Sequence, residues 1–412
     1  MRPLPIGLDI GTTTVRLLQL GGTEKDLRVV DAAKFVIPQE VKSEPARRRE
    51  RVVEGLRRLL KERRFRGREA VSALAVGELA IRNVRLPKMP EEALDTAVNW
   101  EAQNRFPFDT ATAIIQHLPA GEVRQGEQVL DEVILFAAPR AEVDARVQLA
   151  CEAGLDVVSL DAEPCAVFRA FERFLRRRDD ETTVSVFVDI GAETTVAIAR
   201  GRNVVFVKMI PIGGLVFNRA VAECLELSVA EAEALRRRLG RNGSSKFQVS
   251  SSKFQVSSSK FQVSSSKLKT ATQTGRSLGT WNLKLETLTS DTPDEETDRV
   301  CRAVADAIRP HLEDLANEIA LCLRYYSVTF RGQYPESVTF TGGEATSAAI
   351  PTGLAERLGV AVQIGDLFRA VKMDHPVPAL DRRGVLCEWT TAFGLSLKGF
   401  HLAEQLAAGY AS

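Results

Sequence analysis

One short pattern occurs twice in this chain and limits the folds that it can adopt. The stretches GLDIGTTTVRLLQL (7–20) and VSVFVDIGAETTVAIARG (184–201) each run from an apolar segment through Asp-Ile-Gly and hydroxylated residues into a second apolar segment. Two apolar runs around a short polar bend predict a β-hairpin. One such bend is a common structural turn, but two copies indicate an internal duplication.

The chemistry of the two bends makes sense as a pair. Glycine lets backbone amides approach a phosphate oxygen, and threonine adds hydroxyl donors. Asp9 and Asp189 would repel phosphate, so we predict that they hold Mg²⁺ through water, since this ion binds few carboxylates and keeps most of its waters. Arg16 either adds positive charge to the site or forms a surface ion pair. The predicted phosphate ligands are Gly11, Thr12, Thr13, Thr14, Gly191 and Thr194.

A third element has the properties of a nucleoside site. An apolar run at 338–340 leads into Gly342 and Gly343, and a helical pattern follows through Leu354 and Leu358. A strand, a Gly-Gly turn and a helix leave room for a flat base against bare backbone. We therefore expect Gly342 and Gly343 to contact adenosine.

The two hairpins and this turn, in this order, resemble the actin and sugar-kinase superfamily of ATP-binding proteins. The segment DAEPCAVFRAF (161–171) is similar to the connection that precedes the second hairpin there. The resemblance implies an α/β chain with the actin-like ATPase fold, in which two RNase H-like lobes surround a nucleotide cleft. It also implies ATP and Mg²⁺ as cofactors.

The segment between the hairpins narrows the resemblance. Its pattern of strands and helices predicts a small inserted α+β subdomain. Within it, WEAQNRFPF (100–108) is similar to the PilM family of cytoplasmic actin-like proteins of type IV pilus assembly, and so is the stretch at 210–240. The latter similarity implies that Glu233 and Arg236 contact the ribose or base. From the residues alone, Trp100, Phe106 and Phe108 are expected in the subdomain core.

The same resemblance implies partners and a location. A PilM-like protein would be a cytoplasmic scaffold recruited to the cytoplasmic face of the inner membrane. It would bind the amino-terminal cytosolic tail of a bitopic inner-membrane pilus protein similar to PilN, together with platform and motor components. Direct membrane contact would be peripheral at most.

Two alternatives stay open. A sugar-kinase-like small-molecule kinase needs a positioned carboxylate base, and no residue stands out as one. An FtsA-like division protein needs a basic amphipathic helix at the end of the chain, whereas residues 394–412 contain one lysine and no arginine. The catalytic residues are unknown. Glu193 is the sole candidate for orienting a hydrolytic water, so ATP hydrolysis is expected to be weak or absent.

Charge and composition exclude several classes of protein. The net charge of +1 gives no global attraction to nucleic acid. The six cysteines are scattered and form no CxxC pair, which is typical of a reducing compartment. No apolar run approaches ~18 residues, so a cytosolic protein is expected. Residues 45–68 are strongly basic along an apolar helical stripe; this indicates a solvated helix face or contact with lipid or an acidic partner.

The predicted organisation has five parts. A seven-residue repeat rich in serine (243–270) lies within a low-complexity insert that we expect to be disordered or β-prone. The predicted boundaries are a first lobe at 1–70, the subdomain at 71–157, a connection at 158–182, a second lobe at 183–371 with the insert at 242–297, and a return to the first lobe at 372–412.

Overall fold

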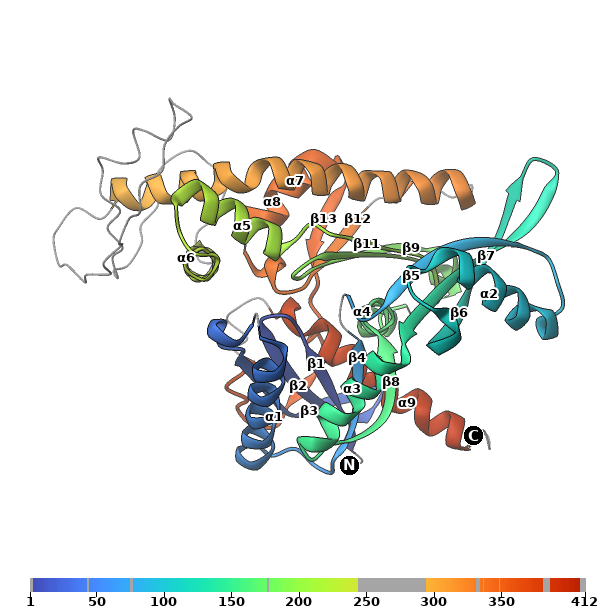
Figure 1. Cartoon of the computed structure of the whole chain (residues 1–412), viewed down its shortest axis with the longest axis horizontal. Helices are drawn as coiled ribbons and strands as arrows, with labels where there is room; N and C mark the ends of the chain where they lie inside the picture. Colours follow the sequence, from blue (N-terminus) through green and yellow to red (C-terminus); the bar gives the residue numbers. More distant parts are fainter. Residues whose placement is uncertain are drawn as a thin grey trace.

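Three β-sheets organise the chain in the computed structural model (Figure 1). The structure describes residues 3–42, 44–74, 77–175, 178–243, 294–330, 334–335, 337–347, 349–380 and 386–407. The repeat lies almost wholly outside the described residues, as does most of the predicted insert.

The first sheet has six strands in the order β14-β3-β2-β1-β4-β8. The first predicted hairpin is formed by β1 and β2, which pair antiparallel, while β4 and β8 continue the sheet in parallel. The strands are β1 Pro3–Ile10, β2 Thr14–Thr23, β3 Asp26–Val36, β4 Glu69–Leu74, β8 Asp156–Ala162 and β14 Lys372–Met373.

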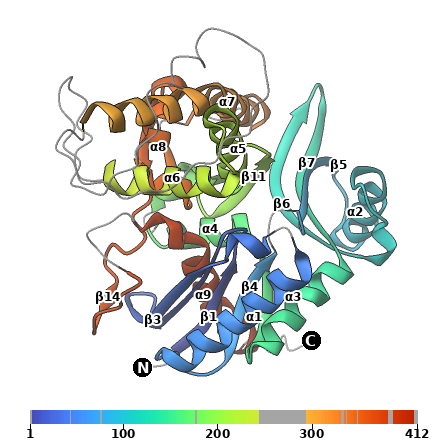
Figure 2. The same cartoon turned by 60° about the vertical axis from the view of Figure 1, so that its left-hand side comes forward.

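Helices cover both faces of this sheet. On one face lie α1 (Pro45–Glu62) and α3 (Arg140–Glu152), side by side in Figure 2. The apolar stripe of α1 is buried there, and each such side chain contributes about 1.5–3 kcal/mol. On the other face lie α4 (Glu163–Glu172) and α9 (Thr390–Ala407). Short 3₁₀ helices precede α1 and α9: η1 (Gln39–Val41) and η5 (Cys387–Trp389).

The packing of α9 against α4 depends on one glycine. A Cβ atom at Gly394 would lie 1.8 Å from the carbonyl oxygen of Ala166. We expect Gly394→Ala to destabilise the protein by about 1–3 kcal/mol, because backbone has to shift to relieve the overlap. Gly353→Ala is the matched control, since a Cβ there meets side-chain atoms rather than backbone, a methyl of Leu312 at 3.3 Å and Arg357 Nη1 at 4.0 Å. Equal urea midpoints for the two variants would contradict this packing.

The second sheet repeats the first. Its order, β11-β10-β9-β12-β13, again has three antiparallel strands followed by two parallel ones. The second predicted hairpin is formed by β9 and β10. The strands are β9 Val184–Ile190, β10 Thr194–Arg200, β11 Asn203–Ile210, β12 Ser337–Thr341 and β13 Ala361–Ile364.

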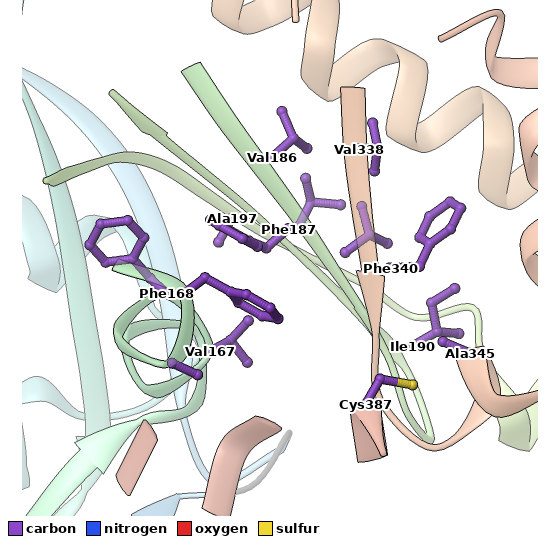
Figure 3. Close-up of a cluster of buried hydrophobic side chains, with 14 of the residues drawn as sticks. Val167, Phe168, Val186, Phe187, Ile190, Ala197, Val338, Phe340, Ala345 and Cys387 are labelled. Carbon is purple, nitrogen blue, oxygen red and sulfur yellow. The ribbon is translucent and has the colours of Figure 1, made fainter. Parts of the chain in front are cut away.

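Four α-helices belong to the second sheet: α5 (Gly214–Leu225), α6 (Val229–Gly243), α7 (Asp294–Phe330) and α8 (Ala349–Leu358). Two short 3₁₀ helices, η3 (Arg178–Thr182) and η4 (Glu344–Thr346), lie before β9 and after β12. Figure 3 shows that Phe168 of α4 lies near Phe187 of β9. Their rings meet edge to face at 6.2 Å, and Phe171 stacks on Phe187 at 4.9 Å. Thus α4 joins the two sheets through one apolar core.

The third sheet is small and has the order β5-β7-β6. Its strands are β5 Ala80–Pro87, β6 Ala113–Gln125 and β7 Gln128–Pro139, and α2 (Glu91–Arg105) and η2 (Thr110–Thr112) pack near them. The core prediction is confirmed for Phe106 and Phe108, whose rings stack at 5.6 Å. It is wrong for Trp100, which is 64% exposed. Because α2 turns Val98 and Ala102 inward, position 100 falls on the opposite face.

The sheets occupy somewhat different ranges from the predicted domains. The third sheet and α2 span 80–139, whereas most of β4 and all of α3 fall within the predicted subdomain at 71–157 but belong with the first sheet. The helices α6 and α7 extend to Gly243 and from Asp294, so they enter the predicted insert from both sides. The first of these differences arises because β4 pairs with β1, a contact that local pattern does not reveal. In the described ranges, no helix has the length and apolarity that a bilayer span requires.

Candidate functional site

A buried ion pair ends the first hairpin. Asp9 lies opposite Arg16 in the β1–β2 register. Arg16 Nη1 is 3.2 Å from Asp9 Oδ2, and its Nη2 is 3.0 Å from Glu388 Oε2. Lys34 Nζ lies 2.5 Å from the other Glu388 oxygen. Because the Arg16 side chain is only 12% exposed, it forms a buried pair rather than a surface one.

The charges around this pair are unequal. Burial raises the pKa of Asp9, although Arg16 opposes the shift. Burial also acts to raise the pKa of Glu388, but the positive charges of Arg16 and Lys34 outweigh it and lower that pKa. Asp9 is therefore the carboxyl of this cluster whose charge is least well compensated.

Asp189 occupies the equivalent position in the second hairpin. It is 7% exposed at the end of β9, beside Thr341 of β12. Burial and, to a smaller extent, the negative charge of Asp9 raise the pKa of Asp189 to about 7, although Arg16 and a hydrogen bond with Thr391 oppose the shift. The structure thus brings the ends of the two hairpins within electrostatic reach of each other.

A third carboxyl, Glu163, was missed by sequence reasoning. It is the first residue of α4, directly after β8. Its pKa lies well above the usual value because of burial, with the charges of Asp189 and Asp9 adding to the effect. The available signal was the Asp-Ala-Glu-Pro run at 161–164, where a strand gives way to a helix with proline in its first turn.

The tip of the first hairpin is held by short-range contacts. The amide of Gly11 donates to the carbonyl oxygen of Thr14 at 3.1 Å. The hydroxyl of Thr13 accepts a hydrogen bond from Arg237 Nη2 at 2.7 Å, and Thr14 is buried. Thr12 is exposed at the tip. Of the three predicted threonine hydroxyls, that of Thr12 is therefore the most accessible to a ligand.

The tip of the second hairpin differs from the prediction at Thr194. Its hydroxyl donates to the carbonyl oxygen of Ile212 at 2.6 Å, and its side chain is fully buried. Thr194 therefore fixes the hairpin to the loop before α5 and does not present its hydroxyl to a phosphate. Gly191 donates to the carbonyl oxygen of Glu193 at 2.9 Å. Glu193 is partly exposed, and burial raises its pKa.

The predicted adenosine turn lies against the second hairpin. Gly342 has φ +92°, and a Cβ there would be 2.2 Å from Asp189 Oδ1 and 2.6 Å from the carbonyl oxygen of Ile190. Gly343 is more open, since the nearest atom to its added Cβ is Arg16 Nη2, at 3.8 Å. Only glycine fits at position 342, because any side chain would collide with the site carboxylate.

The residues expected at the ribose or base are held by protein partners in this structure. Glu233, on α6, pairs with Lys42 at 2.9 Å and with Arg237 at 2.8 Å. Lys42 follows η1 beside the first sheet, so this pair links α6 to the first hairpin region. A ribose could reach Glu233 only by exchanging with one of these cations.

Arg236, three residues further along α6, has a different set of partners. It pairs with Glu344 at 2.5 Å, donates to Asn218 Oδ1, and its guanidinium lies 5.2 Å from the ring centre of Phe217. With its side chain 8% exposed, Arg236 ties α6 to the adenosine turn. Its role at the base would therefore be to position Glu344 and the turn.

The carboxyls of this site suit a cation held indirectly. Within the described ranges, no three metal-ligating side chains lie close enough together to hold an ion directly. Asp189 is nevertheless buried, Asp9 and Glu163 are half-buried, and the three carboxyls act on one another electrostatically and have raised pKa values. A hydrated divalent cation between them would offset this repulsion, so the residues fit Mg²⁺ held through water.

Two surface hollows lie away from this site. One of about 360 Å³ lies between α1 and α3, beside Arg49 and Glu152. The other, of about 520 Å³, lies between β11 and the second half of α7, beside Phe206 and Tyr325. Neither is lined by a predicted nucleotide residue.

Two duplicated sheets with acidic hairpin ends, and a Gly-Gly turn beside the second of them, define an actin-like ATPase fold. The chain belongs to the family of type IV pilus assembly protein PilM, whose model matches residues 7–250 and 298–400. The unmatched gap falls within the predicted insert. No curated protein sequence matches the chain.

Solved structures agree on the fold. A chain of a PilM–PilN type IV pilus biogenesis complex superposes with a TM-score of 0.69 at 24% identity, covering 96% of this chain and 98% of that one. Ethanolamine utilization protein EutJ from Carboxydothermus hydrogenoformans superposes with a TM-score of 0.50 at 14% identity, covering 96% and 90%.

Proposed function

We propose that this protein is a cytoplasmic, nucleotide-binding component of a type IV pilus assembly platform. In this role it binds the amino-terminal cytosolic tail of a bitopic, PilN-like partner, which recruits it to the cytoplasmic face of the inner membrane. The observation that carries the proposal is the meeting of Asp9 and Asp189 beside Gly342, in a chain of the PilM family.

Each part of the nucleotide has a candidate partner. The amides and hydroxyls of the two tips bind phosphates, with Mg²⁺ held through water by the two aspartates. Adenosine lies at Gly342 and Gly343, and ribose lies near Glu233. The residues that contact phosphate directly are Gly11, Thr12, Thr13 and Gly191. The residues that instead hold the surrounding segments in place are Thr14, Arg16, Thr194 and Arg236.

Any hydrolysis of ATP at this site depends on Glu163 rather than on Glu193. The Glu163 carboxyl lies within electrostatic reach of Asp9 and Asp189, whose charges raise its pKa, whereas no neighbouring charge shifts the pKa of Glu193 at the tip. A carboxyl must lie within reach of the attacking water to orient it or accept its proton. We expect Glu163→Gln to lower any ATPase rate while leaving nucleotide binding intact; phosphate release assays with fluorescent-nucleotide titrations would separate the two. An equal rate in this variant would exclude the role.

The small sheet offers a place for the partner tail. Both of its outer strands, β5 and β6, pair within the sheet with β7 alone. An extended peptide can add to such an edge through main-chain hydrogen bonds, with alternate side chains entering pockets. Because a free tail is disordered, its ordering cost limits the complex to moderate affinity.

Calorimetry tests the partner proposal. A synthetic partner tail with an Asn-Leu-Leu-Pro-like segment should form a one-to-one complex with the full chain in the presence of ATP, and a scrambled peptide should not bind. Failure of a panel of such tails to bind, together with phosphorylation of a small hydroxylated compound, would favour the kinase alternative.

A further inference from the structure

The basic stretch at 45–68 divides into two parts in the structure. Six of its eleven cations have partners, and five have none within the described residues. The paired ones are Arg47 with Glu44, Arg48 with the Gly11 carbonyl, Arg49 and Arg57 with Glu152, Arg51 with Glu54 and Arg63 with Asp31. The five others are exposed and form what we call the basic patch: Arg58, Lys61, Arg64, Arg66 and Arg68.

Buried polar groups hold the backbone of this patch in place. Gln19, 1% exposed, donates through Nε2 to the carbonyl oxygen of Arg66 at 2.6 Å and accepts from its amide at 2.7 Å. Asp31, also 1% exposed, accepts from the amide of Arg64 at 2.6 Å and from Arg63. The loop after α1 is therefore fixed to the first sheet, and its arginine side chains stand outward from a rigid backbone.

The patch lies at the far end of α1 from the nucleotide site. Arg48, in the first turn of α1, contacts Gly11 at the hairpin tip. The patch starts in the last turns of the helix at Arg58, about 15 Å further along its axis at a rise of about 1.5 Å per residue. Figure 1 shows this end of α1 beside the amino terminus of the chain. Contact at the patch would leave the hairpin tips accessible.

We infer that the basic patch docks on an anionic lipid surface. Lipid phosphates require only an array of cations near the headgroups. A protein partner would instead need an apolar or aromatic centre, and this stretch exposes none, since Leu59 and Leu60 are buried and Phe65 is half-buried. Glu62, Glu69 and Asp156 are exposed nearby, but five cations against these three acidic residues leave the surface positive.

This contact goes beyond the proposed function, because it needs neither nucleotide nor partner tail. Each cation near an anionic surface contributes roughly fivefold to partitioning. Five cations give weak, reversible binding that salt screens. Together with a bound tail, the patch would orient the first sheet toward the bilayer.

Vesicle sedimentation tests the inference with the full chain alone. The probe is vesicles of phosphatidylcholine with added phosphatidylglycerol, compared with phosphatidylcholine alone. Reversal of three patch charges (R58E, R64E, R68E) should lower partitioning by about 100-fold or more. The matched control (R47E, R51E, R309E) changes net charge equally at exposed cations that already have acidic partners, and it should lower partitioning much less. Unchanged melting temperatures confirm folding in both.

The supporting result is sedimentation with the anionic vesicles only, reversed by salt and lost selectively in the patch variant. Equal binding to neutral vesicles, or an equal loss in both triple variants, would overturn the inference. Failure of the wild-type chain to sediment with the anionic vesicles would overturn it as well. The tail calorimetry does not involve lipid, so failure of one proposal is distinguishable from failure of the other.

Discussion

Asp189→Asn is expected to abolish most of the rise in melting temperature that ATP and Mg²⁺ produce. A ligand that binds only the folded state stabilises it by about 2.7 kcal/mol at a hundredfold excess over Kd. The variant keeps the shape of the side chain beside Gly342 but removes the charge that we propose holds the hydrated cation. Glu193→Gln, at the same hairpin, is the control and should retain the shift. An unchanged shift in Asp189→Asn would count against the site.

The same variant should also change how apo stability depends on pH. The folded-state pKa of Asp189 is about 7, above the ordinary 3.8, so the folded protein holds the proton that the unfolded chain loses. As pH rises from about 4 to 7, this difference destabilises the wild type by up to about 4 kcal/mol. In the Asp189→Asn variant, this loss of stability with rising pH is absent. The variant should therefore be more stable than wild type at pH 8, with little difference below pH 4, as measured by urea unfolding.

Gly342→Ala is expected to have the largest effect on stability. Position 342 has a left-handed backbone, which costs a non-glycine residue about 1–2 kcal/mol. The overlap of the new Cβ with Asp189 and the Ile190 carbonyl adds about 1–3 kcal/mol. The variant should also lose the ATP-dependent shift, because relief of the overlap moves the Asp189 carboxyl.

Gly359→Ala isolates the backbone contribution. Gly359 also has a left-handed φ, +63°, but no atom lies within 4 Å of its added Cβ. This control should lower the free energy of unfolding only by the strain of the left-handed backbone, and it should keep nucleotide binding. Urea midpoints and ATP-dependent melting measure both quantities. If the two variants were equally stable, the close approach of the adenosine turn to Asp189 would be wrong.

Sequence pattern was sufficient to predict the strands, bends and helices whose formation depends on residues close together in the chain. The two hairpins form where apolar runs flank Asp-Ile-Gly, because strand alternation and glycine at a bend depend on neighbours in sequence. The long helix α7 follows from apolar spacing after residue 300. The duplication itself was visible in sequence, and the two sheets share their strand order.

Only the tertiary structure decided which way individual polar side chains face. Thr194 lies in the duplicated motif, yet its hydroxyl binds Ile212, a residue in another segment. Glu163 became a site residue because β8 pairs with β4, which in turn pairs with β1, so that its carboxyl comes within electrostatic reach of Asp9 and Asp189. The basic stretch divided into paired and unpaired cations because α3 and β3 supply acceptors to some of them. Sequence determined where strands, bends and helices form, since those depend on near neighbours; the role of each polar group depended on partners that only chain folding brings into contact.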